Sequence, residues 1–262
     1  MEASVFQGLL ITTLAGLSTA IGSFFGIYSR KPTPSFLAFS LGFSAGVMVF
    51  VAFLELLPTA VQTPGLGLVR AYSAFFAGMV IYFLIDLLVP HDYIGQHDHT
   101  ENGAYPREAV RRPALERTGL LVMLGITIHN FPEGMATFIS TVHDLKFGLA
   151  LGVAIALHNI PEGIAIAAPV YVSSGSRRKA FFWSFSSGLS EIVGGILAAA
   201  VLMPFLSPIV MGIALAGVGG IMVSISLDEL IPVAKSFDSE HFPTLGVITG
   251  MVVMAVSLYL LS

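Results

Sequence analysis

The sequence contains no cysteine and few charged side chains. Without cysteine, neither disulfide bonds nor thiolate metal ligands are possible. Charged residues make up 11% of the 262 residues and hydrophobic ones 55%, and the mean hydropathy is +0.86. A soluble domain of this length needs more charge to cover its surface. The whole chain, residues 1–262, is therefore expected to form a single membrane domain with the lipid bilayer as its surroundings.

Basic residues do not outnumber acidic ones: there are 12 Lys and Arg against 16 Asp and Glu. The formal net charge is −4, so no nucleic-acid partner is expected. The first residues, Met1 to Ser4, lack the basic stretch of a cleaved signal peptide. The first apolar stretch is therefore expected to stay in the protein as a membrane helix.

Long apolar stretches dominate the chain. Eight of them approach or exceed the roughly 20 residues that a helix needs to cross a bilayer. They are Val5–Ile27, Phe36–Leu57, Ala71–Val89, Gly119–Thr141, Phe147–Val172, Ala180–Leu202, Ile209–Val233 and Leu245–Leu261. The pattern predicts an all-α, polytopic membrane protein. Only one connection is long, at about residues 91–118, and we predict a polar, histidine-containing cytoplasmic loop there.

The distribution of basic residues predicts the orientation. Ten of the twelve fall on connections 1–2, 3–4, 5–6 and 7–8: Arg30, Lys31, Arg107, Arg111, Arg112, Arg117, Arg177, Arg178, Lys179 and Lys235. Only Arg70 and Lys146 fall on the other side. The positive-inside rule then places both termini outside the cytoplasm, in a multi-pass protein of the plasma (inner) membrane.

The chain also repeats itself. Residues 16–22, GLSTAIG, echo residues 188–194, GLSEIVG, and residues 55–58, ELLP, echo residues 229–232, ELIP. The two echoes are separated by nearly the same distance along the chain (16 to 188 and 55 to 229). Because the matching helices run in opposite directions, helices 1–3 and 6–8 are predicted to be inverted repeats around a central pair, a 3+2+3 arrangement typical of secondary transporters.

The membrane spans contain acids without matching bases. Seven of the sixteen acids lie in or at the ends of the predicted spans: Glu55, Asp86, Glu133, Glu162, Glu191, Asp228 and Glu229. No Lys or Arg lies deep in a span. Ionisable groups in hydrocarbon are costly and usually functional. A buried acidic cluster without buried bases indicates a site for protons or metal ions.

Two HN-x-PEG segments, one on each central helix, favour metal ions. His129 and Glu133 are four residues apart, so they lie roughly 40° apart around a helix, and Asn130 falls on the other side of Glu133. The carboxylate, between an imidazole and an amide, can bridge two ions. His158, Asn159 and Glu162 repeat the arrangement. Nitrogen and oxygen ligands of this kind suit zinc and neighbouring divalent ions.

Other candidates are less well defined. Glu191 lies in a run of small residues that leaves room for it to face the same cavity. Met48 is by default a core residue. Glu55, Asp86, Asp228 and Glu229 fit interfacial helix ends as well as a site, and the role of the 91–118 loop is equally open.

These motifs, with the GLSE of the sixth span and the long loop after the third, resemble the ZIP (Zrt-/Irt-like protein) family of divalent metal transporters, bacterial zinc-uptake branch. The resemblance covers essentially the whole chain. It implies uptake of zinc into the cytoplasm, with iron, manganese, cobalt and cadmium as further ions. Zinc is then the transported substrate and no catalytic cofactor is expected.

The resemblance also implies a binuclear site and its ligands. The first ion is expected near His129, Glu133, His158 and Glu162. The second is expected near Asn130, Asn159 and Glu191, with Glu133 and Glu162 as bridges. Met48 matches a position that some members use as a ligand. His158 stands where some members have an acid or amide, which favours zinc.

Two other classes of protein share part of the pattern. Paired membrane histidines can ligate haem, but a cytochrome does not need the duplicated Asn and Glu. An intramembrane metalloprotease needs a motif such as HExxH, which is absent. We therefore predict a transporter and not an enzyme. Ion selectivity, the coupling of protons or anions, carrier against channel mechanism, and the oligomeric state, with a homodimer as one arrangement, stay open.

Overall fold

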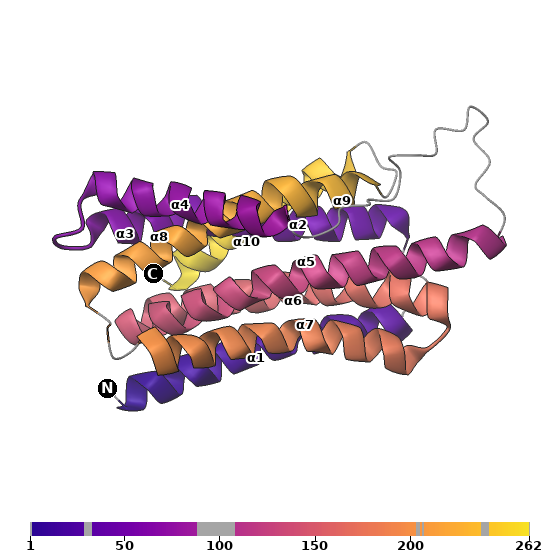
Figure 1. Ribbon diagram of the computed structural model, residues 1–262, viewed down its shortest axis with the longest axis horizontal. Helices are drawn as coiled ribbons and strands as arrows, with labels where there is room; N and C mark the ends of the chain where they lie inside the picture. Colours follow the sequence, from indigo (N-terminus) through magenta and orange to yellow (C-terminus); the bar gives the residue numbers. More distant parts are fainter. Residues whose placement is uncertain are drawn as a thin grey trace.

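The computed structural model describes residues 2–28, 33–87, 108–202, 205, 207–236 and 241–261 (Figure 1). Within these ranges, all the secondary-structure elements are helices. The α-helices are α1 Glu2–Tyr28, α2 Pro34–Val51, α3 Leu57–Gln62, α4 Leu68–Asp86, α5 Glu108–His143, α6 Leu145–Ser174, α7 Arg177–Leu197, α8 Pro208–Ile225, α9 Ile231–Ser236 and α10 Phe242–Leu261. Three π-helical turns adjoin some of them: η1 Ala52–Leu56, η2 Ala198–Leu202 and η4 Ser226–Leu230.

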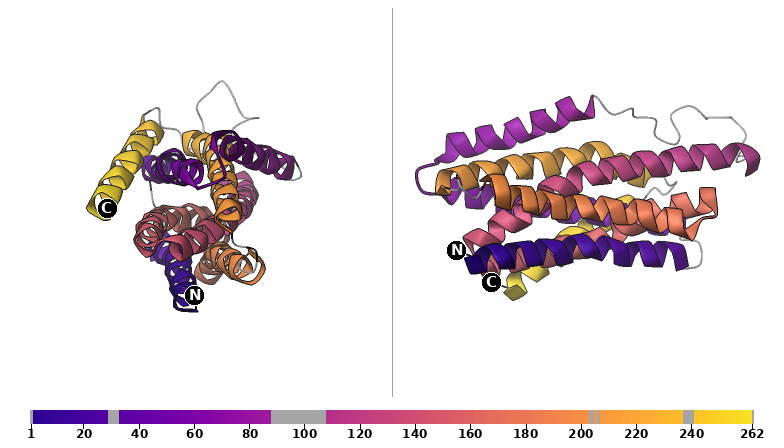
Figure 2. Two further views of the ribbon diagram at one scale, coloured as in Figure 1. Left: turned by 90° about the vertical axis from the view of Figure 1, so that its left-hand side faces the viewer. Right: turned by 60° about the horizontal axis from the view of Figure 1, so that its bottom comes forward.

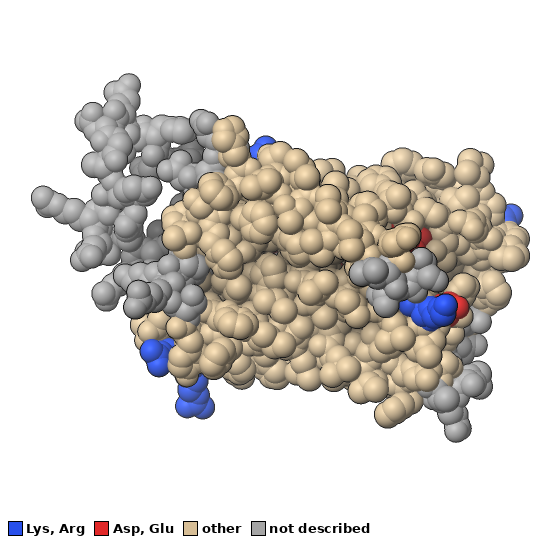
Figure 3. All heavy atoms as spheres, turned by 180° about the vertical axis from the view of Figure 1, so that it is seen from behind, with Lys and Arg blue, Asp and Glu red and all other residues tan. Residues whose placement is uncertain are grey.

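Within the described residues, the predicted membrane spans fall on helices except for the turn at Leu87. Seven helical segments of the described chain are long and apolar enough to cross a membrane. The remaining predicted span, Gly119–Thr141, which is the fourth along the chain, lies inside α5. Figure 3 shows a long face whose visible charged atoms lie toward its two ends, with an uncharged middle. The exposed side chains include many large apolar ones, such as Phe76, Phe83 and Val256. The protein is therefore a multi-pass membrane protein.

One boundary differs clearly from the prediction. Helix α5 begins at Glu108, not near Gly119, so residues 108–118 are helical where a loop was expected. Ala, Leu, Glu and Arg are strong helix formers, and Pro113 stands close to the helix start. The remainder of the predicted loop, residues 91–107, lies outside the described residues, as do Arg30 and Lys31.

The long helices pack in two groups (Figures 1 and 2). Helices α1, α5, α6 and α7 pack against one another and form one bundle. In the second group α2 packs on α10 and α4 packs on α8. Contacts of α2 with α6 and of α5 with α8 join the groups. Both termini lie at one end of the molecule, and α7 begins and α9 ends toward the other.

Helices α2 and α8 are interrupted in the same way. The bounds of α2, η1 and α3 recur at one constant offset in α8, η4 and α9 (34 to 208, 51 to 225, 62 to 236). In both, a π-helical turn immediately precedes the turn that contains Pro58 or Pro232. Proline lacks the N–H donor and crowds the carbonyl four residues before it, and the wider turn relieves that clash.

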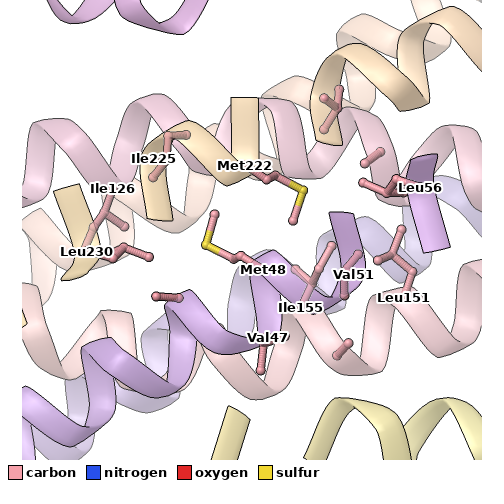
Figure 4. Packing of buried hydrophobic residues seen from close by; sticks show 14 of the residues in the cluster. Val47, Met48, Val51, Leu56, Ile126, Leu151, Ile155, Met222, Ile225 and Leu230 are labelled. Atoms are coloured by element: carbon pink, nitrogen blue, oxygen red, sulfur yellow. The ribbon is translucent and has the colours of Figure 1, made fainter. Parts of the chain in front are cut away.

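An apolar core lies where the two groups meet. Met48 of α2 and Met222 of α8 are both buried in this cluster (Figure 4). Ile155 of α6 and Ile126 of α5 belong to the same cluster. This apolar core therefore fills the interface between α5 and α6 of the bundle and the helices α2 and α8.

Candidate metal site

The bundle of α1, α5, α6 and α7 holds the predicted polar residues in its interior. Six of them have no exposed surface: Asn130, Glu133, His158, Asn159, Glu162 and Glu191. The first two come from α5, the next three from α6 and the last from α7. Buried polar and charged groups are retained only where something compensates their desolvation. All six side chains therefore lie in the interior of this bundle.

A carboxylate and an imidazole meet between α5 and α6. Glu133 Oε1 lies 3.3 Å from His158 Nε2. The backbone of His158 is also held, because the hydroxyl of Ser44 on α2 donates to its carbonyl at 3.1 Å. An imidazole nitrogen beside a carboxylate oxygen is a donor pair that suits zinc and similar ions.

Both asparagines are anchored through their amide nitrogens. Asn159 Nδ2 donates to the carbonyl of Ala15 at 2.9 Å and to Glu191 Oε2 at 2.6 Å. Asn130 Nδ2 donates to the carbonyl of Ser187 at 3.3 Å. The two Oδ1 atoms are buried and accept no hydrogen bond from the described residues. Anchoring the nitrogen fixes the amide, and the oxygen is left to face a cation.

Glycines bring the backbones of this bundle close together. A Cβ on Gly134 would overlap the carbonyl oxygen of Glu191, and a Cβ on Gly163 would overlap that of Thr19. Only glycine allows helices to approach so closely. The PEG glycines therefore set the position of α7 against α5 and of α1 against α6, and through them the position of Glu191.

Two of the eight predicted ligands, His129 and Met48, are not among these six buried polar residues. Among the described side chains no three histidine, aspartate or glutamate groups lie together as a metal cluster. The side chain of His129 lies outside the described set. Met48 is on the same face of α2 as Ser44, one turn further, and lies in the apolar cluster.

The acids whose role the sequence left open lie on helical segments other than α5, α6 and α7. Glu55 is half-buried on η1, and Glu229 is buried on η4. Asp86, at the end of α4, accepts a hydrogen bond from Tyr82 at 3.4 Å. Sequence reasoning missed the hydroxyl and carbonyl groups of α1 and α7 that hold the asparagines. The repeated GLS segments were the available signal, since Ala15 and Ser187 immediately precede them.

Fold and site together define a multi-pass helical membrane protein with a buried carboxylate, imidazole and amide site. Comparisons with known proteins give the family. Residues 95–258 match the model of the ZIP zinc transporter family. Zinc transporters ZupT from Salmonella paratyphi A, Salmonella newport and Salmonella enteritidis are 46% identical over 253 residues, which is 97% of this chain and 96% of each relative.

The chain belongs to the ZIP zinc transporter family. The resemblance stated from the HN-x-PEG motifs is confirmed. The family and these relatives are transporters and not enzymes, so the proteolytic and haem-binding alternatives are set aside.

Proposed function

We propose that this protein carries zinc across the membrane into the cytoplasm through the buried site between α5, α6 and α7. The observation that carries the proposal is the pair of anchored asparagines, one of which donates to Glu191, together with the Glu133–His158 contact. They form a fully buried oxygen and nitrogen donor set on helices of a zinc transporter family member. Zinc is the substrate of this site, not a resident cofactor.

Two ion positions are proposed. The first takes its ligands from the histidines and the shared carboxylates: His129, Glu133, His158 and Glu162. The second takes Asn130, Asn159 and Glu191 together with the same shared carboxylates. The 3.3 Å contact of Glu133 with His158 supports the first, and the 2.6 Å contact of Asn159 with Glu191 supports the second. Met48, one turn from Ser44, stays a proposed additional ligand.

Inverted repeats are proposed as the origin of this geometry. The identical division of α2–η1–α3 and α8–η4–α9 supports a common ancestral unit. The packing also supports it. The first predicted repeat comprises α1, α2 with α3, and α4, and the second comprises α7, α8 with α9, and α10. Helix α2 of the first repeat contacts α10 of the second, and α8 of the second contacts α4 of the first. Repeats of opposite topology place a site near the membrane midplane.

The orientation of the chain in the membrane is proposed from charge. Helix α7 begins with Arg177, Arg178 and Lys179, and α9 carries Lys235 near its end, both away from the termini (Figure 1). Arg70 and Lys146 lie near the starts of α4 and α6, at the end where the termini lie. The positive-inside rule makes the end with the termini the outer one. Dimerisation and transport of ions other than zinc stay predictions.

Zinc flux into proteoliposomes that contain a zinc-sensitive dye tests the function. Glu133→Gln keeps the volume and removes the charge, so we expect flux to fall to the protein-free background. Glu55→Gln, a matched change on η1 outside the site, should keep most of the flux. Wild-type flux in a folded Glu133→Gln protein would refute the shared carboxylate.

A further inference from the structure

Two helix contacts in the bundle match residue for residue. In each, a glycine Cβ would overlap a backbone carbonyl of the facing helix, and the overlap occurs in both directions. For α1 on α6 the pairs are Gly22 with Ile160 and Gly163 with Thr19; for α7 on α5 they are Gly194 with Phe131 and Gly134 with Glu191. The positions on α1 recur on α7 at one constant offset (22 to 194, 19 to 191).

The asparagine anchors obey the same correspondence. Asn159 donates to the carbonyl of Ala15, and Asn130 donates to the carbonyl of Ser187, again at that offset (15 to 187). Thr19 on α1 therefore occupies the place that Glu191 occupies on α7. The two halves of the bundle share these backbone contacts, and at this matched position α1 has a threonine where α7 has a glutamate.

The hydroxyl of Thr19 is one of several buried hydroxyls without a partner among the described residues. Thr19 has no exposed surface, and its Oγ1 makes no hydrogen bond with the described residues. A buried hydroxyl without a partner lowers the stability of the folded protein. In the other half, Glu191 reaches Asn159 at 2.6 Å. Threonine is shorter than glutamate, and on the matching side Asn130 Nδ2 donates to Ser187 Oγ at 3.4 Å, while the Thr19 hydroxyl has no partner within the described part of the chain.

We propose that Thr19 is a specificity-determining residue, whose hydroxyl holds a water of the ion bound between Asn130 and Asn159. The inference rests on the proposed function of that site. With the two asparagines, the two shared carboxylates and Glu191 as five donors, the water held by Thr19 is the sixth. A neutral hydroxyl and a water complete the shell without adding a fourth carboxylate, which would hold a divalent ion more tightly and slow its release.

The sixth donor matters differently to different ions. Manganese prefers six oxygen donors, whereas zinc is satisfied by four. Loss of the hydroxyl should therefore weaken manganese binding more than zinc binding. If Thr19 only fills space, the isosteric change Thr19→Val removes an unpaired hydroxyl and leaves both affinities unchanged.

Calorimetric titration of the purified full-length protein with Mn²⁺ or Zn²⁺ tests this. In Thr19→Val we expect manganese affinity to fall about tenfold, in the range of lost outer-shell contacts to a metal, and zinc affinity to change less. Thr19→Ser keeps the hydroxyl and should bind manganese as the wild type does. Thr12→Val is the matched control, because Thr12 is also buried on α1 with a hydroxyl that has no partner among the described residues, but lies against Gly195.

Two results would overturn the role of Thr19: unchanged manganese affinity in Thr19→Val, or an equal loss in Thr12→Val. Failure of the underlying site is recognised separately. If Glu133→Gln binds zinc and manganese as the wild type does, the proposed function fails. If that variant loses binding while Thr19→Val does not, only the inference about Thr19 fails.

Discussion

Helices α2 and α10 pack by the same device as the bundle that holds the site. Gly42 and Gly46 of α2 lie against carbonyls of α10, and Gly246 and Gly250 of α10 lie against carbonyls of α2. Neither helix contains an acid, a base or a histidine. In the bundle of α1, α5, α6 and α7, the glycine contacts surround three buried glutamates. Close backbone packing is thus common to both regions, and only one of them uses it to position charge.

The first way to sharpen this comparison is a methyl group added in each region. Gly134→Ala places a Cβ on the carbonyl of Glu191, and Gly250→Ala places one on that of Phe43. Overpacking of this kind costs about 1–3 kcal/mol, so both should lower the thermal unfolding midpoint in detergent. Only Gly134→Ala should abolish zinc flux in protein that remains folded. Equal zinc flux in the two variants would contradict the prediction that the contact of Gly134 with Glu191 positions the site.

Removing the imidazole should have the next largest effect. His158→Ala deletes the nitrogen that lies 3.3 Å from Glu133. We expect zinc affinity to fall by more than about 100-fold, beyond the range of outer-shell contacts. Thr249→Ala on α10 is the control, since its hydroxyl donates to the carbonyl of Leu245 in its own helix. Titration with zinc decides, and a loss below about threefold in His158→Ala would contradict direct ligation.

A smaller loss is expected at the asparagines. Asn159→Ala removes one oxygen donor and the hydrogen bond that holds Glu191. An amide oxygen is a weaker zinc ligand than imidazole, so zinc affinity should fall about tenfold, less than in His158→Ala. Asn159→Asp restores an oxygen and should recover part of the affinity. An Asn159→Ala loss as large as that of His158→Ala would argue against two separate ion positions.

The smallest effect is expected at Ser44, which belongs to α2 and so touches both regions. Ser44→Ala removes its bond to the carbonyl of His158 but leaves the imidazole in place. One hydrogen bond contributes about 1 kcal/mol, so stability should fall slightly and zinc affinity by no more than about fivefold. Thermal unfolding and zinc titration measure both. A complete loss of binding would place Ser44 among the ligands.

Much of the candidate site was predictable from local sequence. The HN-x-PEG motifs lie within continuous helices, and their Asn and Glu side chains, with His158, are buried as their spacing indicated. The helix start at Glu108 was missed because polar residues with two nearby prolines give no apolar period. The π-helical turns were missed because the widened turn is a local response to Pro58 and Pro232 that hydropathy does not register.

The sequence by itself determined that the chain is a helical membrane protein, where its apolar helices lie, and which residue types the candidate site offers, because hydropathy and helical spacing are properties of neighbouring residues. Which helices meet was decided only by the tertiary structure. Nothing near Gly134 in the chain indicates that it faces Glu191, or that Thr19 matches that glutamate. Such contacts join residues far apart in the chain, and they depend on how small residues let two backbones approach.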